Sequence, residues 1–150
     1  MPPTKKGLLK KTINFILYLV FVVGLVYFTP KLLSYGLKTQ YPMAAITSGS
    51  MWPVLKKGDL VFIQGINPKE IMIGDIVVYT NVKNTFTIHR IIELGAETLV
   101  TKGDANNTPD APIRYENIVG RLYKIGDWEA RIPKLGLIST FISQYVQKNG

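Results

Sequence analysis

The sequence contains no cysteine and a single histidine, His89, among its 150 residues. The absence of cysteine excludes a disulfide framework, a thiol nucleophile and a cysteine–zinc site. A catalytic zinc ion needs three protein ligands, most often histidines, so one histidine does not suggest such a site. Neither of the two common glycine-rich phosphate-binding loops is present. We therefore expect no metal and no cofactor.

Two common serine-enzyme signatures are also missing. Ser50 is followed three positions later by Pro53, so there is no Ser-x-x-Lys motif, and the chain has no Gly-x-Ser-x-Gly elbow. If Ser50 is a nucleophile, His89 is the only imidazole that can take its proton. The alternative is that Ser48 and Ser50 are turn residues ahead of Pro53, and that His89 is a surface residue or a hydrogen-bonded core residue. The residue types alone leave both interpretations open.

Acidic residues are scarce, and the formal net charge is +8. Such an excess is typical of nucleic-acid binding proteins, but here its distribution argues against that class. Residues 39–131 carry ten basic and ten acidic side chains, so this central block is neutral. The whole excess comes from lysines around the hydrophobic segment and in the C-terminal tail, namely Lys5, Lys6, Lys10, Lys11, Lys31, Lys38, Lys134 and Lys148. We expect membrane lipid headgroups, and not nucleic acid, as their counterpart.

Charge is absent from residues 12–30, and residues 13–28 are almost wholly apolar. About 20 residues of helix cross the hydrocarbon core, so this stretch is just long enough for a transmembrane anchor, which we expect Pro30 to end. Four lysines precede it and only two follow closely, which predicts a cytoplasmic N-terminus and a domain on the outer or lumenal side. The alternative is a removable signal peptide, but its apolar region would be shorter, and no small-x-small site follows Phe28.

The remainder of the chain has a mainly β pattern. Short β-branched and aromatic runs, most of them bounded by Gly, Asn, Asp or Pro, predict strands at 60–63, 76–79, 85–92, 98–101 and 118–125.

The C-terminal tail has a helical pattern. Its apolar side chains repeat at helical spacing through Ile138, Phe141, Ile142, Tyr145 and Val146, which predicts a short amphipathic helix. This helix could pack on the β domain, lie in the membrane interface or bind a partner. We predict a basic N-terminus (1–11), an anchor (12–30), a connector (31–40), a β domain (41–131) and the tail (132–150).

A serine–histidine pair needs a carboxylate to orient the imidazole, and one polar loop offers two. Asp104 and Asp110 both lie in residues 103–112. The alternative is a solvated loop with a turn at each aspartate. If the strand at 85–92 alternates, Thr87, His89 and Ile91 share one face. The residues alone do not decide between the two aspartates.

Five ordered blocks of sequence carry a resemblance to a known family. They lie at 48–53, 57–61, 74–79, 87–91 and 101–112. Together they make the chain similar to the type I signal peptidases of the serine–histidine kind, which occur in archaea, in the endoplasmic reticulum and in some Gram-positive bacteria. The resemblance covers nearly the whole chain, anchor included. It implies a β-rich catalytic domain on a single-pass anchor in the cell membrane, or in the endoplasmic reticulum membrane of a eukaryote, that removes signal peptides from exported proteins.

The resemblance also implies roles for individual residues. Ser50 matches the acyl-forming nucleophile, His89 the base and Asp110 the essential aspartate, whereas Asp104 matches a supporting aspartate. Ser48 matches a residue whose hydroxyl helps the Ser50 backbone N–H form the oxyanion hole. Residues before the nucleophile and before the base are expected to bind an extended substrate with Ala-x-Ala-like side chains: Met43, Ala44, Ala45, Ile46, Thr47, Phe86, Thr87 and Ile88. The expected partners are precursor proteins and membrane lipid, and the sequence does not decide whether partner subunits are needed.

Two positions depart from the family pattern. Trp52 stands where the family usually has Glu, and Ala105 replaces a common Asn. Neither change removes a proton-transfer group, so we expect activity. A non-catalytic relative that acts in the assembly of secreted or surface proteins is the main alternative. A self-cleaving repressor-type peptidase would need a lysine base and a DNA-binding domain, and a β domain that only binds ligands would leave the five ordered blocks to coincidence.

Overall fold

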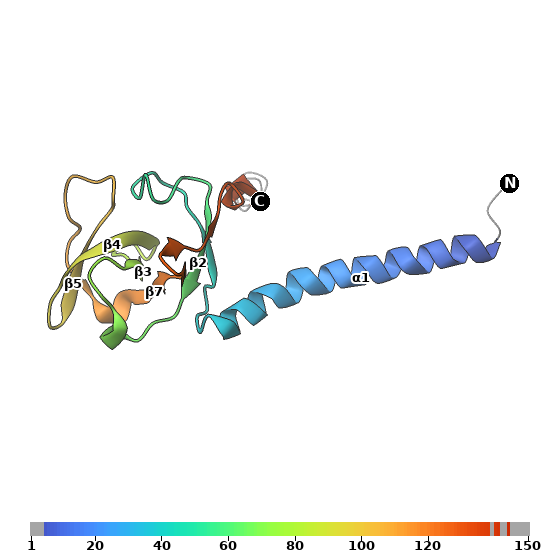
Figure 1. The fold of residues 1–150 in the computed structure, drawn as a ribbon, viewed down its shortest axis with the longest axis horizontal. Helices are drawn as coiled ribbons and strands as arrows, with labels where there is room; N and C mark the ends of the chain where they lie inside the picture. The colour runs from blue at the N-terminus through green and yellow to red at the C-terminus, as the bar shows by residue number, and fades with distance from the viewer. Residues whose placement is uncertain (1–4, 139, 142–143, 145–150) are drawn as a thin grey trace. The chain divides into compact units, whose positions relative to one another are not determined.

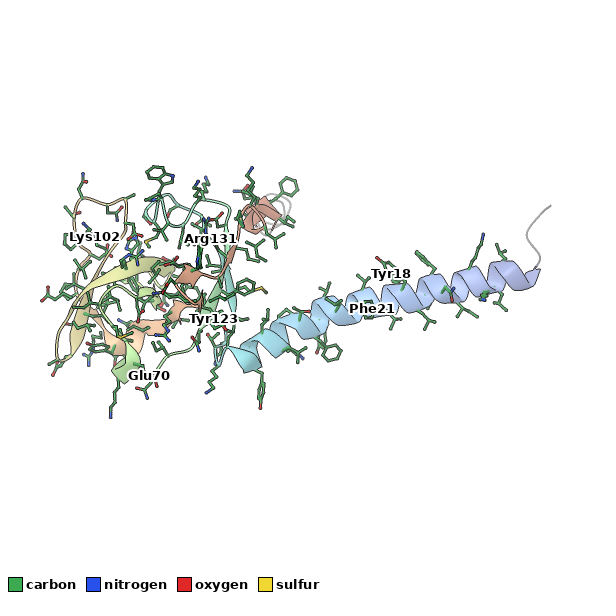
Figure 2. All side chains as sticks on the ribbon, viewed as in Figure 1. Tyr18, Phe21, Glu70, Lys102, Tyr123 and Arg131 are labelled. Carbon is green, nitrogen blue, oxygen red and sulfur yellow. The ribbon has the colours of Figure 1, made fainter. Side chains whose placement is uncertain are left out.

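The chain forms two compact units in the computed structural model, which describes residues 5–138, 140, 141 and 144. The first unit, Met1–Gly36, contains one long helix, α1 (Lys5–Gly36), and the second, Leu37–Gly150, contains the strands (Figure 1). Within α1, the stretch Gly7–Gly36 is long and apolar enough to cross a membrane, and none of its most apolar window is buried. Side chains such as Tyr18 and Phe21 project outward from it (Figure 2). The prediction of a mainly β protein with one N-terminal membrane helix is confirmed.

The prediction that Pro30 ends the helix is wrong, because α1 continues through Pro30 to Gly36. The connector at 31–40, for which the sequence allowed a short helical or an irregular segment, is helical as far as Gly36. Proline removes one backbone N–H, but an apolar surrounding offers no water to replace broken helix bonds, so the helix persists. The Thr29 hydroxyl donates to the Leu25 carbonyl at 2.6 Å, which adds a bond beside the proline.

The second unit contains an eight-stranded antiparallel sheet and a separate two-stranded hairpin. The path through the sheet is β1-β2-β7-β3-β4-β5-β6, with β10 also paired to β2, and β8 pairs with β9. The strands are β1 (Met43–Ala45), β2 (Leu60–Gln64), β3 (Ile76–Thr80), β4 (Phe86–Leu94), β5 (Thr98–Lys102), β6 (Ile113–Arg114), β7 (Ile118–Leu122), β8 (Lys124–Ile125), β9 (Trp128–Glu129) and β10 (Arg131–Ile132). Two 3-10 turns, Pro68–Glu70 and Tyr115–Asn117, lie between them.

Each predicted strand has a counterpart in this sheet, with one change. The run at 118–125 is divided into β7 and β8, which belong to different sheets. The two-residue strands β6, β9 and β10 are too short to show an alternating pattern, so the sequence gives no sign of them.

Strand β3 is covered on both faces, since its first four residues are all buried. Ile76 and Val78 belong to one core cluster with Ile46, Met51, Leu55, Val61, Ile63 and Leu122. Val77 and Tyr79 belong to a second cluster with Ile71, Ile91 and Leu99. This buried strand bears on the site because Val77 lies directly opposite His89 on β4.

The C-terminal tail begins a helix that packs on the β unit. Gly136 is buried, and the Leu137 side chain lies so close to Gly58 that a Cβ on Gly58 would come within 2.7 Å of it. Of the three placements left open by the sequence, this first turn shows packing on the β unit. Ile138 and Phe141 are exposed. The other predicted apolar positions, Ile142, Tyr145 and Val146, lie outside the described residues.

Candidate active site

Three side chains form a continuous hydrogen-bonded chain. The Ser50 hydroxyl oxygen lies 3.1 Å from His89 Nε2, and His89 Nδ1 lies 2.6 Å from Asp110 Oδ2. A carboxylate at Nδ1 favours the tautomer that carries its proton there, which leaves Nε2 free to accept a proton from the hydroxyl. This arrangement contains a nucleophile, a base and a group that orients the base.

Ser50 lies in the turn that follows β1, and its position is fixed from two directions. The next residue, Met51, is 2% exposed, and Leu55 is fully buried, so both anchor the turn in the first core cluster. The Ala105 backbone N–H donates to the Ser50 carbonyl at 2.8 Å. A neighbouring glycine permits this approach, since a Cβ on Gly103 would lie 2.7 Å from the same carbonyl.

His89 is 7% exposed and lies on β4 in register with Val77 of β3. One alternative from the sequence was that His89 is only a hydrogen-bonded core residue. Both of its ring nitrogens do have partners, but one partner is the hydroxyl of a half-buried serine beside a groove. The geometry thus adds a reactive group to what would otherwise be a satisfied core histidine.

Asp110 is held by more than His89. Its Oδ2 also accepts from the Thr101 hydroxyl at 2.7 Å and from the Tyr79 hydroxyl at 3.3 Å. Burial raises the pKa of Tyr79, and the nearby negative charge of Asp110 raises that pKa further, so the phenol stays protonated and can donate. Neither hydroxyl shows a pattern in the sequence, and the strand register alone reveals them.

Asp104 does not contact His89. Both of its carboxylate oxygens accept from Arg90 at 2.8 Å, and the same guanidinium donates to the Gly74 carbonyl at 2.8 Å. The hydrogen bonds that Arg90 donates to Asp104 are the main reason that the pKa of Arg90 is raised. Of the two aspartates, Asp110 therefore contacts the imidazole of His89. Asp104 instead connects its loop to Arg90, the residue that follows His89. The sequence signal for Arg90 was only its place beside His89.

Ser48 lies beside the candidate nucleophile, with its hydroxyl oxygen 3.1 Å from that of Ser50. Within the part of the chain that the structure describes, the Ser50 backbone N–H donates to no other atom. A hydroxyl and an unused N–H at this position could together bind a negatively charged oxygen formed next to Ser50.

A groove of about 450 Å³ runs up to Ser50 and His89. It is lined by Ala44, Ala45, Ile46, Thr47, Ser48, Ser50, Met51, Phe86, Thr87, Ile88 and His89. Seven of the eight expected substrate-binding residues are in this lining, and Met43 is not. Met51 lines the groove although the sequence gave no reason to include it.

The backbone on both sides of the groove has unused hydrogen-bonding edges. Antiparallel bonding alternates along a strand, and Ile46 bonds to Asp59 on the β2 side, so Ala45 directs its N–H and C=O away from β2. Likewise Ile91 bonds toward β3, so Ile88 directs its backbone to the opposite edge of β4. Among the described residues, β5 pairs with β4 only from Arg90 onward, so no strand pairs with this edge at Ile88. An extended peptide could add as a strand to either edge.

Among the described residues, no group of three or more His, Asp and Glu side chains is arranged to hold a metal ion.

The sequence of the chain is similar to those of several known proteins. No protein-family model matches the chain. The chain is 30% identical to the signal peptidase complex catalytic subunit SEC11 of Zygosaccharomyces rouxii over 138 residues, 85% of this chain and 81% of that protein. It is 31% identical to the protein of the same name from Lachancea thermotolerans over 139 residues, 85% and 82% of the two chains. The protein of that name from Colletotrichum graminicola is 35% identical over 112 residues, 69% of this chain and 65% of the relative.

Proposed function

The chain belongs to the family of the signal peptidase complex catalytic subunit SEC11, and we propose that Ser50, His89 and Asp110 carry out its peptide-bond hydrolysis. It is a type I signal peptidase, a membrane-anchored serine protease that removes signal peptides. The observation that supports these residue roles best is the continuous chain of contacts from the Ser50 hydroxyl through His89 to the Asp110 carboxylate.

The reaction follows from the position of each group. His89 Nε2 takes the proton of the Ser50 hydroxyl as its oxygen attacks the scissile carbonyl carbon, and Asp110 stabilises the imidazolium that forms. The Ser50 N–H and the Ser48 hydroxyl donate to the oxyanion. The imidazolium then protonates the leaving amine, which breaks the peptide bond and leaves an acyl group on Ser50. His89 then deprotonates a water, whose oxygen attacks the ester carbonyl carbon. The imidazolium returns this proton to the Ser50 oxygen as the acyl bond breaks, which releases the signal peptide with its new carboxylate and restores the enzyme.

The substrate lies extended along the groove as an added strand. Its backbone pairs with the free edges of β1 and β4, at Ala45 on one side and Ile88 on the other. Small side chains such as Ala44 and Ala45 line the groove together with Met51. Small residues in an Ala-x-Ala-like arrangement ahead of the scissile bond fit this space.

Helix α1 places the catalytic unit at the membrane. The lysines at its N-terminal end favour a cytoplasmic N-terminus, so the unit Leu37–Gly150 lies on the outer or lumenal side. Signal peptides emerge from the same bilayer, and confining enzyme and substrate to it raises their encounter rate. The relatives carry the name of a subunit of a complex, so we extend to this chain the expectation of partner subunits beside its precursor substrates.

The experiment that tests this function uses the full chain in lipid vesicles with a secreted precursor that contains an Ala-x-Ala site. We expect a mature product whose N-terminus, measured by mass spectrometry, follows that site. A serine-reactive fluorophosphonate should label Ser50 in the wild type and fail to label it in His89→Ala.

The proposed function would be contradicted by a folded chain that neither cleaves the precursor nor reacts with the probe. That result would support the alternative, a non-catalytic relative that acts in assembly.

A further inference from the structure

The carboxylate of Asp110 has several hydrogen-bond partners in the sheet although it comes from an irregular loop. Residues 103–112, between β5 and β6, contain no strand or helix. Yet Asp110 Oδ2 has three partners, His89, Thr101 and Tyr79, at 2.6, 2.7 and 3.3 Å. Loop residues are ordinarily more mobile than the sheet, so something in the sheet must fix this side chain.

Thr101 connects the loop to the sheet at this point. It lies on β5 directly opposite Ile91 of β4, and Ile91 is two residues from His89, so both side chains project from the same face. Thr101 is fully buried. It contacts Asp110 twice, because its hydroxyl donates to the carboxylate and its carbonyl accepts from the Asp110 backbone N–H at 2.8 Å.

Tyr79 reaches the same oxygen from the other neighbouring strand. It lies on β3 opposite Thr87 and two residues from Val77, the register partner of His89. It is 4% exposed, and its hydroxyl oxygen lies 3.3 Å from that of Thr101. Strand β4, which lies between β3 and β5, thus has His89 flanked by a hydroxyl from each neighbouring strand, and both hydroxyls converge on one carboxylate oxygen.

We propose, on the basis of the function given above, that Thr101 and Tyr79 are positioning residues for catalysis, whose hydroxyls hold Asp110 Oδ2 against His89 Nδ1. Thr101 is the principal one, since its contact is the shorter. Asp110 retains 24% side-chain exposure, so without these donors its carboxylate can rotate toward solvent. The imidazole then loses the partner that keeps its proton on Nδ1, and Nε2 is less often ready to accept a proton from Ser50.

Thr101→Val is the first test, because valine has nearly the shape of threonine and carries a methyl group in place of the hydroxyl. Losing a hydrogen bond to a charged group predicts a fall in kcat of about 10- to 100-fold, with KM unchanged within about twofold. Thr101→Ser retains the hydroxyl and should restore most of the wild-type kcat. Thr98→Val, on the same strand, is the matched control and should cleave at the wild-type rate.

Tyr79→Phe tests the second donor. Its longer contact predicts a smaller effect, a fall in kcat of about three- to tenfold. Tyr115→Phe is its matched control, because Tyr115 packs against the same core cluster and loses an equivalent hydroxyl contact, to the Gly95 carbonyl at 2.9 Å, away from Asp110.

A spectroscopic measurement separates positioning from mere core packing. The chain has one histidine, so ¹⁵N-histidine labelling of the full chain in micelles reports His89 alone. The wild type should show the Nδ1–H tautomer, Thr101→Val a mixture of tautomers, and Thr101→Ser the wild-type spectrum. A core-packing role would leave the spectrum of each folded variant unchanged.

The outcomes also separate this inference from the function on which it rests. If the wild type cleaves precursor, and Thr101→Val matches it in both kcat and the imidazole spectrum, the positioning role is wrong and the proposed function stands. If the wild type does not cleave but the spectrum changes as expected in Thr101→Val, the positioning is correct and the proposed function is wrong.

Discussion

Asp104 and Asp110 lie six positions apart in one loop, but they have different partners. Asp110 contacts His89, whereas Asp104 forms two hydrogen bonds with Arg90. We predict that Asp110→Asn lowers kcat/KM by about 10³- to 10⁴-fold, because an amide no longer favours the productive tautomer. In Asp104→Asn, Arg90 can still donate to the one amide oxygen, which is uncharged, so kcat/KM should fall by about tenfold. Precursor cleavage measures both, and a larger loss in Asp104→Asn would reverse the assignment.

Ser48 makes a second prediction at this scale. If its hydroxyl donates to the oxyanion, Ser48→Ala should lower kcat by about 10²- to 10³-fold with little change in KM. Ser48→Thr keeps a hydroxyl and is the matched variant that should retain activity. Steady-state cleavage of the precursor provides the measurement, and wild-type kcat in Ser48→Ala would remove this residue from the mechanism.

Individual residues differ in how much of their role the sequence can reveal. Ser50 and His89 could be found because the chain offers one imidazole and a family motif around the serine. The residue types alone did not separate Asp110 from Asp104, since both are polar loop residues. The family resemblance assigned Asp110 the essential role, and in the structure it is Asp110 that contacts His89. Thr101 and Tyr79 could not be found, because a hydroxyl inside a β-branched or aromatic strand looks like ordinary core. Their role depends on register, which brings three separate strands to one carboxylate.

At the scale of elements, the turn at residues 103–106 links Ser50 and His89, the proposed nucleophile and base. Ala105 donates to the Ser50 carbonyl, and Asp104 binds the residue beside His89. Gly103→Ala would place a Cβ 2.7 Å from the Ser50 carbonyl, so the turn must move away. We predict a loss of activity of about tenfold or more, because small displacements of catalytic groups are costly. Gly49→Ala is the steric control, since a Cβ there meets nothing within 4 Å.

The measurement for Gly103→Ala is kcat/KM on the precursor together with the melting temperature. Retained activity in a variant that melts like the wild type would show that the turn does not position Ser50.

A partly buried ion pair joins Asp59, the residue before β2, to Arg131 of β10. Arg131 lies 2.6 Å from the Asp59 carboxylate, which is 2% exposed. Burial alone would raise the pKa of Asp59, but hydrogen bonds from the Lys56 backbone N–H and from Arg131 outweigh it and lower the pKa. A lowered carboxyl pKa contributes stability above the unfolded-state value of about 4, and that stability is lost as the pH falls through the folded-state value.

The prediction is that the free energy of unfolding of the wild type falls as the pH is lowered below about 4, and that Asp59→Asn shows a weaker dependence. Denaturant titrations followed by tryptophan fluorescence at a series of pH values measure this. Identical pH dependence in the two proteins would mean that Asp59 titrates alike in the folded and unfolded states.

The sequence predicted the strands better than the end of the helix. Alternating or β-branched runs predicted five strands. The predicted helix end at Pro30 was wrong, because the rule that proline ends a helix assumes that water can replace the broken hydrogen bonds. The short strand β10 is invisible to any pattern because it is defined by its pairing with β2.

For the whole molecule, the central prediction is its orientation in the membrane. The absence of cysteine allows one introduced thiol to report topology without background. Val82 is fully exposed and does not line the groove, so Val82→Cys should leave activity intact. A membrane-impermeant maleimide added outside intact cells should label it, or, for a protein of the endoplasmic reticulum, should fail to label it from the cytosolic side of sealed microsomes. The reverse pattern would place the catalytic unit on the cytoplasmic side.

The central claim is that Ser50 is the nucleophile of a membrane-anchored signal peptidase. The most direct test is the rate at which the full-length Ser50→Ala chain cleaves a precursor in vesicles, compared with the wild type at equal, folded concentration. Our account predicts a loss of at least about 10³-fold, because the hydroxyl oxygen that forms the acyl bond is gone. Cleavage within about twofold of the wild-type rate would contradict it.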